Sequence, residues 1–248
     1  MPLFNKENIP IAGTFGHGLG NDPTLGGILP DMTQQDWATL FESGIYVDDN
    51  APGDPAPGNP DISDPCENGT WEHPFDAIKE AIGTAVDGNT IIVKDGTYTG
   101  TGNRNINFHG KAITLRSRNG PANCIIDCQQ LGTGFEFSSE EWTDSVVDGF
   151  TIINGYDEDQ GKGGGGIHCA WSSPTIINCI ITANKAWRGG AIFCNSANPT
   201  ITNCTITDNE SLYDEGGGIC CWYGSPTITN CTISRNTSPY GAAGLSCY

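Results

Sequence analysis

The sequence predicts an all-β fold: a right-handed parallel β-helix with three sheets and a short N-terminal capping helix. Three observations lead to this prediction. A unit of about 25 residues repeats in the C-terminal half, and each unit holds short β-branched stretches separated by Gly, Pro or Asn turns. The chain also contains 34 Gly and 15 Pro residues and only 16% charged residues. Such a composition indicates many short turns and little helix.

The repeat aligns three segments, residues 163–188, 189–215 and 216–240, and a fourth begins at residue 241. The anchor prolines Pro174, Pro199 and Pro226 recur at intervals of 25 and 27 residues. Each unit has about three short strands, which is typical of a three-sided coil. Strands of adjacent coils would lie about 4.8 Å apart, so every repeat position forms a ladder of stacked residues.

The alternation within each unit predicts which ladders form the core. The inward rows are Ile167, Ile192, Ile219 and Leu245; Cys169, Cys194, Cys221 and Cys247; Ile176, Ile201 and Ile228; Cys179, Cys204 and Cys231; and Ile181, Ile206 and Ile233. Two asparagine rows accompany them, namely Asn178, Asn203 and Asn230 at a bend between strands, and Asn184, Asn209 and Asn236 at the end of the next strand. Asparagine suits such bends because it tolerates left-handed backbone and its amide can bond a stacked neighbour.

The N-terminal part is less regular and divides into three predicted regions. Residues 1–44 form an extension that could dock on another surface, residues 45–70 form an acidic loop rich in Pro and Asp, and residues 71–248 form the β-helix. Within the last region, Phe75, Ile78, Ala81 and Ile82 share one helical face. We expect this helix to lie across the first coil and cap its core, followed by a strand at Thr90–Val93.

The motifs IYVDDNAPGDP, EHPFDAIKEAI and IIVKDGTYTG, together with GGAI, NPTI and NCTIT in the repeats, resemble the pectin-lyase-like superfamily of right-handed β-helices. They look most like planctomycete-type envelope and surface proteins and the repeats of polymorphic outer-membrane proteins. The resemblance covers residues 45–248 and implies an extracellular or cell-surface location. It is specific for fold and open for function, because the superfamily includes lyases, hydrolases, phage tailspikes and adhesins.

Charge and hydropathy exclude some partners. The formal charge is 11 minus 29, or −18, which repels nucleic acid and anionic membrane surfaces. The chain has no apolar run of 18 or more residues, and its N-terminus shows no signal-peptide pattern. We therefore expect no nucleic acid partner and no membrane insertion.

The eleven cysteines fall into two groups. Seven occupy the inward ladders, where parallel side-chain vectors disfavour a disulfide, so buried free thiols are expected. Cys66, Cys124, Cys128 and Cys220 lie outside the ladders. These four could form one or two disulfides in an oxidising compartment, and the sequence leaves their pairing open.

A structural calcium ion is the one cofactor that the sequence suggests. Carboxylates crowd the acidic loop, whose candidate ligands are Asp48, Asp49, Asp54, Asp61 and Asp64, with Glu67 nearby. Oxygen ligands on a flexible loop suit calcium, although the spacing is not that of an EF-hand.

Six aromatic residues at or beside the repeat turns are the candidate binding residues: Trp171, Trp187, Tyr213, Trp222, Tyr223 and Tyr240. Exposed rings of this kind suit a polysaccharide or a protein partner, and the alternative is that they pack on one another over the coil corners. The last coil, from residue 241, shows no polar cap, so we also expect self-association through this coil and the N-terminal extension.

The leading functional hypothesis is thus a non-catalytic extracellular structural or adhesive β-helix that assembles into a filament or oligomer or binds a glycan. The alternative is a polysaccharide lyase or glycoside hydrolase that uses carboxylates of the acidic turns at residues 157–159 and 214–215. No catalytic residue is assigned, and His17 and His168 are expected to be ordinary surface histidines. A third hypothesis is ice binding by the outward threonine rows, Thr200 with Thr202 and Thr227 with Thr229.

Overall fold

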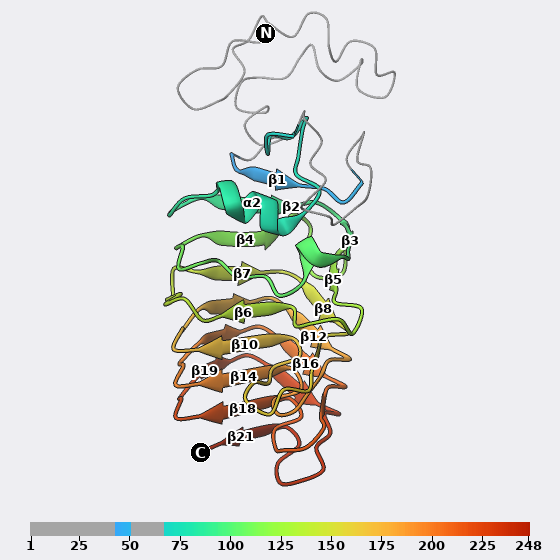
Figure 1. Cartoon of the computed structure of the whole chain (residues 1–248), viewed down its shortest axis with the longest axis vertical. Coiled ribbons are helices and arrows are strands. Elements are labelled where there is room, and N and C mark those ends of the chain that lie inside the picture. The colour runs from blue at the N-terminus through green and yellow to red at the C-terminus, as the bar shows by residue number, and fades with distance from the viewer. Residues whose placement is uncertain (1–42, 51–66) are drawn as a thin grey trace, which may run out of the picture. The chain divides into compact units, whose positions relative to one another are not determined.

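The computed structural model describes residues 43–50 and 67–248 of the chain. Residues Gly44–Tyr248 form one compact unit. It is a parallel β-solenoid in which successive coils stack from the helix α2 to the last strand β21 (Figure 1). The fold class is therefore the one that the repeat predicts.

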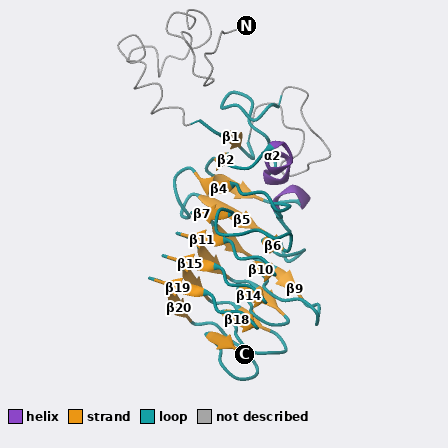
Figure 2. Cartoon of the chain, turned by 90° about the vertical axis from the view of Figure 1, so that its left-hand side faces the viewer, coloured by secondary structure: helices purple, strands orange, loops and turns teal. Residues whose placement is uncertain are grey.

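Three long sheets and one minor sheet run along the stack (Figure 2). The first sheet has seven strands: β1 (Ile45–Val47), β2 (Thr90–Val93), β4 (Thr114–Ser117), β7 (Val146–Asp148), β11 (Thr175–Ile177), β15 (Thr200–Thr202) and β19 (Thr227–Thr229). The second has six: β3 (Gly96–Tyr98), β5 (Cys124–Asp127), β8 (Thr151–Ile153), β12 (Ile180–Thr182), β16 (Thr205–Thr207) and β20 (Thr232–Ser234). The third has five: β6 (Phe135–Phe137), β10 (Ile167–Ala170), β14 (Ile192–Asn195), β18 (Ile219–Trp222) and β21 (Leu245–Cys247). The minor sheet, which the sequence does not foretell, consists of the two-residue strands β9 (Tyr156–Asp157), β13 (Lys185–Ala186) and β17 (Glu210–Ser211). In the three coils from β7 to β18 the chain passes through the first, second, minor and third sheets in that order.

The predicted inward ladders are confirmed by the strand register. Ile176 pairs with Ile201 and Ile201 with Ile228 in the first sheet, and the cysteine row follows the same rule in the third sheet. These side chains, except the exposed Cys247, belong to one continuous core, which is fully buried in the middle coils. Burial decreases toward the last described coil, where Leu245 is 41% exposed.

Both asparagine rows lie where the repeat places them. Asn178, Asn203 and Asn230 have φ angles of 55°, 55° and 56°, and each side chain donates to the row neighbour before it, at 3.2 and 3.1 Å. The row of Asn184, Asn209 and Asn236 is buried, and here each side chain donates in the opposite direction, to the row neighbour after it, at 3.0 Å. A side chain that is both donor and acceptor can thus repeat indefinitely along a stack.

All ten described cysteines are free thiols. Cys124, Cys128 and Cys220, which could have formed disulfides, are buried and free. Burial raises the pKa of Cys128 and of Cys220 to about 12 in each case. Such thiols behave as small apolar side chains rather than as nucleophiles. Cys66 lies outside the described residues.

The N-terminal end of the core is closed by helix α2 (Ile78–Thr84), which packs against β1, β2 and the short 3-10 helix η2 (Thr101–Asn103). Ile78, Ala81 and Ile82 are buried in the core, as the helical pattern predicts. Asn103 of the following coil accepts the first helical N–H, that of Ile78, at 2.8 Å. Within the described residues, no helix is long and apolar enough to cross a bilayer.

Two details of this end differ from the prediction. Phe75, predicted to lie on the helix, precedes it instead. Its backbone forms a parallel bridge with Val47 of β1. Residues 45–47, expected to begin the acidic loop, form strand β1 and pair with β2 from Ile45↔Ile91 to Val47↔Val93. Their β-branched and aromatic side chains favour a strand, and the edge of β2 is available for backbone hydrogen bonds.

Candidate ligand-binding site

A polar groove of about 410 Å³ follows the corner at which the second sheet passes into the minor sheet. At this corner each coil places one residue in the left-handed region: Asn154 (φ 55°), Ala183 (φ 56°), Asp208 (φ 57°) and Arg235 (φ 54°). The left-handed residue turns the chain sharply between two strands, so the corner is concave and repeats from coil to coil. The groove is lined by Gln130, Asn154, Gly155, Ala183, Lys185, Asp208, Glu210, Arg235 and Thr237.

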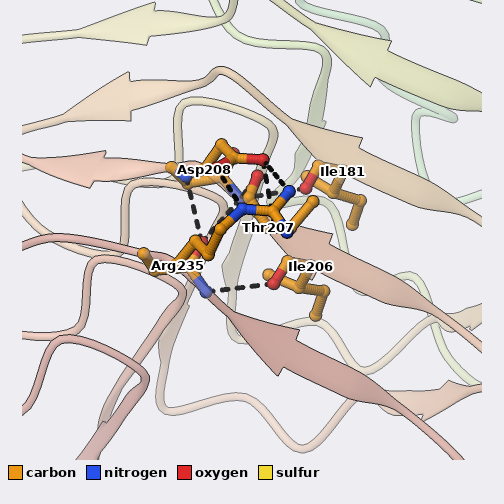
Figure 3. A network of polar contacts seen from close by, with 7 residues as sticks. Ile181, Ile206, Thr207, Asp208 and Arg235 are labelled. Carbon is orange, nitrogen blue, oxygen red and sulfur yellow. Dashed lines mark hydrogen bonds and ion pairs between the residues drawn. The ribbon is translucent and has the colours of Figure 1, made fainter.

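The charged side chains in the groove pair across neighbouring coils. Arg235 donates from Nε and Nη2 to the two carboxylate oxygens of Asp208, at 2.8 and 2.6 Å (Figure 3). Lys185 Nζ lies 2.7 Å from Glu210 Oε2. The groove therefore holds two cations and two carboxylates and is locally balanced, although the chain as a whole is strongly acidic.

The pair of Arg235 and Asp208 defines the protonation state of the Asp208 carboxyl group. The hydrogen bonds from Arg235 lower the pKa of Asp208 below its ordinary value. The carboxylate stays ionised at neutral pH, where it accepts hydrogen bonds from hydroxyl groups but has no proton to give.

An aromatic platform lies on the same face of the minor sheet. Trp187 follows Lys185 by two residues, so both side chains point outward. The backbone N–H of Trp187 donates to the Asp157 carbonyl at 2.6 Å, which extends the backbone pairing between β13 and β9 by one residue. Tyr213 of the next coil donates its N–H to Trp187 O. The two rings lie 4.4 Å apart between centroids at an angle of 33°, and Tyr213 is 54% exposed. The structure thus brings together two of the six candidate aromatic residues.

The other predicted aromatic residues lie elsewhere. Trp171 and Tyr223 occupy the left-handed corner after the third sheet and are 65% and 83% exposed. Trp222 is half-buried, with the Arg188 guanidinium 3.8 Å from its ring centroid. Tyr240 is exposed on the turn before the last strand. Trp187 thus packs on Tyr213, whereas Trp171 and Tyr223 present their rings to solvent, and binding of a partner by these residues stays a prediction.

The residues predicted to bind calcium are only partly described. Asp48 forms an ion pair with Lys94 at 3.1 Å. Asp49 is buried and accepts hydrogen bonds from the Thr97 N–H at 3.1 Å and from Asn50 Nδ2 at 2.7 Å. Asp54, Asp61 and Asp64 lie outside the described residues, so calcium binding by this loop stays a prediction.

A second carboxylate cluster lies at the N-terminal end of α2, and the sequence analysis named its Glu67 but not its Asp76 and Glu80. Single carboxylate oxygens of Glu67, Asp76 and Glu80 all lie within 4.8 Å of one another. Burial raises the pKa of Asp76, and burial with the neighbouring Asp76 raises the pKa of Glu80 to about 8. The spacing of Asp76 and Glu80, four residues apart at a helix start, was the signal that could have revealed the cluster.

His168 was expected on the surface, and this prediction is wrong. The side chain is only 7% exposed, its Nδ1 bonds the Gly163 carbonyl at 3.0 Å, and its ring contacts the Phe193 edge. The outward row of the third sheet, which continues with Phe193 and Cys220, is buried as well. The turns that join the minor sheet to the third sheet cover this face, a tertiary contact that the alternation within a strand does not reveal. His17 lies outside the described residues.

The acidic turns proposed for a hydrolase are engaged in separate contacts. Asp214 pairs with Nε of the buried Arg188 at 3.0 Å, and Glu215 accepts a hydrogen bond from Ser246 Oγ at 2.6 Å. Asp157 is partly buried in the minor sheet, and burial raises its pKa. The outward threonine rows form as expected, with Thr200 paired to Thr227 and Thr202 to Thr229. Ice binding by these rows and self-association through the last coil both stay predictions.

Comparison with known proteins bears on the fold. Residues 89–248 match the family model described as a right handed beta helix region. No curated protein and no solved structure matches the chain. The matched segment covers more than half of the sequence and spans the regular coils from β2 to β21. The chain belongs to the right-handed β-helix family.

Proposed function

We propose that the protein is a non-catalytic, extracellular adhesive β-helix that binds a neutral polysaccharide along the groove between its second and minor sheets. The observation that carries the proposal is the packed pair of Trp187 and Tyr213, which follow the groove-lining residues Lys185 and Glu210 by two and three positions in the chain. The resemblance of the motifs to surface proteins supports the extracellular location.

The platform has the chemistry that a sugar needs. The apolar face of a pyranose ring packs on an aromatic face, and ring hydroxyls take hydrogen bonds at the rim. The groove offers the Asn154 and Gln130 amides, the Thr237 hydroxyl and the paired charges of Asp208 and Arg235. Amides and hydroxyls donate and accept at once, which suits the hydroxyl groups of a sugar.

The repeat favours a polymer over a single sugar. The left-handed residues from Asn154 to Arg235 belong to four successive coils. With coils about 4.8 Å apart, this row extends over about 14 Å along the stack. A chain lying along the groove would meet one corner residue from each of the four coils.

Charge favours a neutral ligand. The net charge of −18 repels an acidic polysaccharide, whereas the ion pairs leave the groove itself without excess charge.

The chemistry of the carboxylates favours binding over cleavage. A glycosidase needs one carboxyl group that is protonated at working pH, and Asp208 is held ionised by Arg235 while Glu210 is paired with Lys185.

Binding is tested by affinity electrophoresis and titration calorimetry of the full chain against a panel of neutral and acidic polysaccharides. Trp187→Ala removes half of the platform and is expected to weaken binding at least about tenfold, the equivalent of about 1.4 kcal/mol. Trp171→Ala is the matched control, because it deletes an exposed tryptophan at another corner of the coil. It is expected to bind as the unchanged protein does.

Cleavage is tested on the same panel by the release of reducing ends and of unsaturated sugars. Binding without product release supports the proposal. Product release that disappears in Asp208→Asn or Asp157→Asn would favour the hydrolase or lyase alternative. Equal loss of binding in Trp187→Ala and Trp171→Ala would contradict the assignment of the site.

A further inference from the structure

We propose that Glu67, Asp76 and Glu80 form a binding site for a hard divalent cation, calcium, at the N-terminal cap of the β-helix. This site differs from the loop of Asp48 and Asp49, whose carboxylates already take part in an ion pair and in hydrogen bonds. The site is also independent of the proposed glycan groove.

The three carboxylates converge from two segments. Glu67 directly follows the part of the chain that the structure leaves undescribed, Asp76 precedes helix α2, and Glu80 lies in its first turn. One oxygen of each lies within 4.8 Å of the others. Oxygens on opposite sides of a calcium ion, each 2.3–2.6 Å from it, lie about 5 Å apart, so the cluster has the right size.

Asp76 supplies the observation that distinguishes this cluster from an ordinary acidic surface. The residue is 0% exposed, and among the described residues its carboxylate meets no cation and no side-chain donor other than the carboxyl group of Glu80. Glu80 Oε2 is likewise buried without a partner there. The described ion pairs include neither residue. Buried carboxylates are normally paired, hydrogen-bonded or bound to a metal, and a cation between these three would meet that need.

Asp76 does not serve as the N-cap of helix α2. Asp often caps a helix by accepting an N–H of the first turn, but here the N-cap position is Ala77, and Asn103 accepts the Ile78 N–H. The Asp76 side chain is thereby left to face Glu67 and Glu80.

A bound ion would connect the cap. Gly69, two residues after Glu67, accepts a hydrogen bond from the N–H of Tyr46 in β1 at 2.8 Å. Calcium held by Glu67, Asp76 and Glu80 would therefore tie the segment paired with β1 to helix α2. Three oxygen ligands leave room for water or further oxygens, since calcium takes six to eight ligands.

The test uses the full chain freed of metal with a chelator. Titration calorimetry with calcium chloride is expected to show one cap site with a Kd on the order of 10⁻⁵ to 10⁻³ M, and calcium is expected to raise the Tm. Asp76→Asn and Glu80→Gln should each weaken binding at least about tenfold, because each removes one of three charged ligands. Glu72→Gln is the control, since it removes the same charge from a nearby exposed residue and should bind as the unchanged protein does.

Circular dichroism separates lost binding from lost folding. Without metal, Asp76→Asn is expected to be at least as stable as the unchanged protein, because the substitution relieves repulsion among buried carboxylates. With calcium, only the unchanged protein and Glu72→Gln should gain stability. An unchanged protein that binds no calcium, or that binds only zinc, would overturn the proposal. So would full binding in both Asp76→Asn and Glu80→Gln, since the ion would then lie elsewhere.

Discussion

The side-chain amide of Asn184 donates to Oδ1 of Asn209 in the next coil at 3.0 Å, and both residues are buried. Asn209 in turn donates to Asn236, so one continuous row of amides runs along the interior. Each amide also bonds the backbone of the preceding coil, as Asn209 Nδ2 does with Ile181 O at 2.9 Å. The row therefore connects the coils through side chains as well as through the strands.

Substitution of Asn209 by Ala should destabilise the fold by about 2–3 kcal/mol, because the Asn184 N–H and the Ile181 carbonyl lose their partner in a buried site. Chemical denaturation followed by circular dichroism measures this change. Asn203→Gly is the matched control in the exposed row. Its backbone has φ 55°, which Gly adopts readily, so the free energy of unfolding should change by less than about 1 kcal/mol. Equal losses in the two variants would contradict the special role of the buried row.

His168 should make the stability fall in mild acid. Burial lowers its pKa, against the opposing effects of the Gly163 carbonyl, Glu136 and Asp157, while Lys162 adds to the lowering. Since the unfolded chain then takes up a proton more readily, this contribution is complete above about pH 6.5 and is lost as the pH falls below it. Through His168, the free energy of unfolding changes by at most about 1.4 kcal/mol per pH unit.

The variant His168→Gln isolates this effect from the many carboxylates, because Gln can still donate to the Gly163 carbonyl but does not titrate. Denaturation curves between about pH 7.5 and pH 5.5 should show a smaller loss of stability in the variant than in the unchanged protein. Parallel pH profiles would contradict this account, because they would mean that His168 has the same pKa in the folded and the unfolded chain.

The cysteines should differ sharply in reactivity. Cys247 is exposed, and burial of its thiol raises the pKa only to about 11, whereas Cys194 is fully buried in the core. Alkylation of the native protein followed by peptide mass spectrometry should therefore label Cys247 first, at a rate that rises with pH up to about 11. Cys194 should react only after unfolding. Early labelling of Cys194 would show that the coils open locally.

The sequence predicted the ladders because a stack places identical residues in identical surroundings. Ile201 needs the same pocket as Ile176, and Asn203 the same bend as Asn178, so the repeat itself reveals the register. The capping helix could be predicted for a related reason, since Ile78, Ala81 and Ile82 lie on one face.

Contacts between distant segments could not be predicted in this way. The alternation within a strand assigns His168 to the outer face, but only the folded turns decide that this face is covered. Glu67 and Asp76 meet because β1 and α2 pack together, and no local pattern encodes that contact. The groove arises from left-handed residues of different types, from Asn154 to Arg235. No single residue type recurs at this position of the repeat, so the repeat pattern does not reveal the groove.

The proposed function depends on the platform of Trp187 and Tyr213, and the most direct measurement is calorimetric titration of the protein with a neutral polysaccharide before and after Trp187→Ala. We predict that the unchanged protein and Trp171→Ala bind alike, without releasing products, and that Trp187→Ala binds at least about tenfold more weakly. Undiminished binding by Trp187→Ala, or cleavage of the polysaccharide by the unchanged protein, would contradict the account.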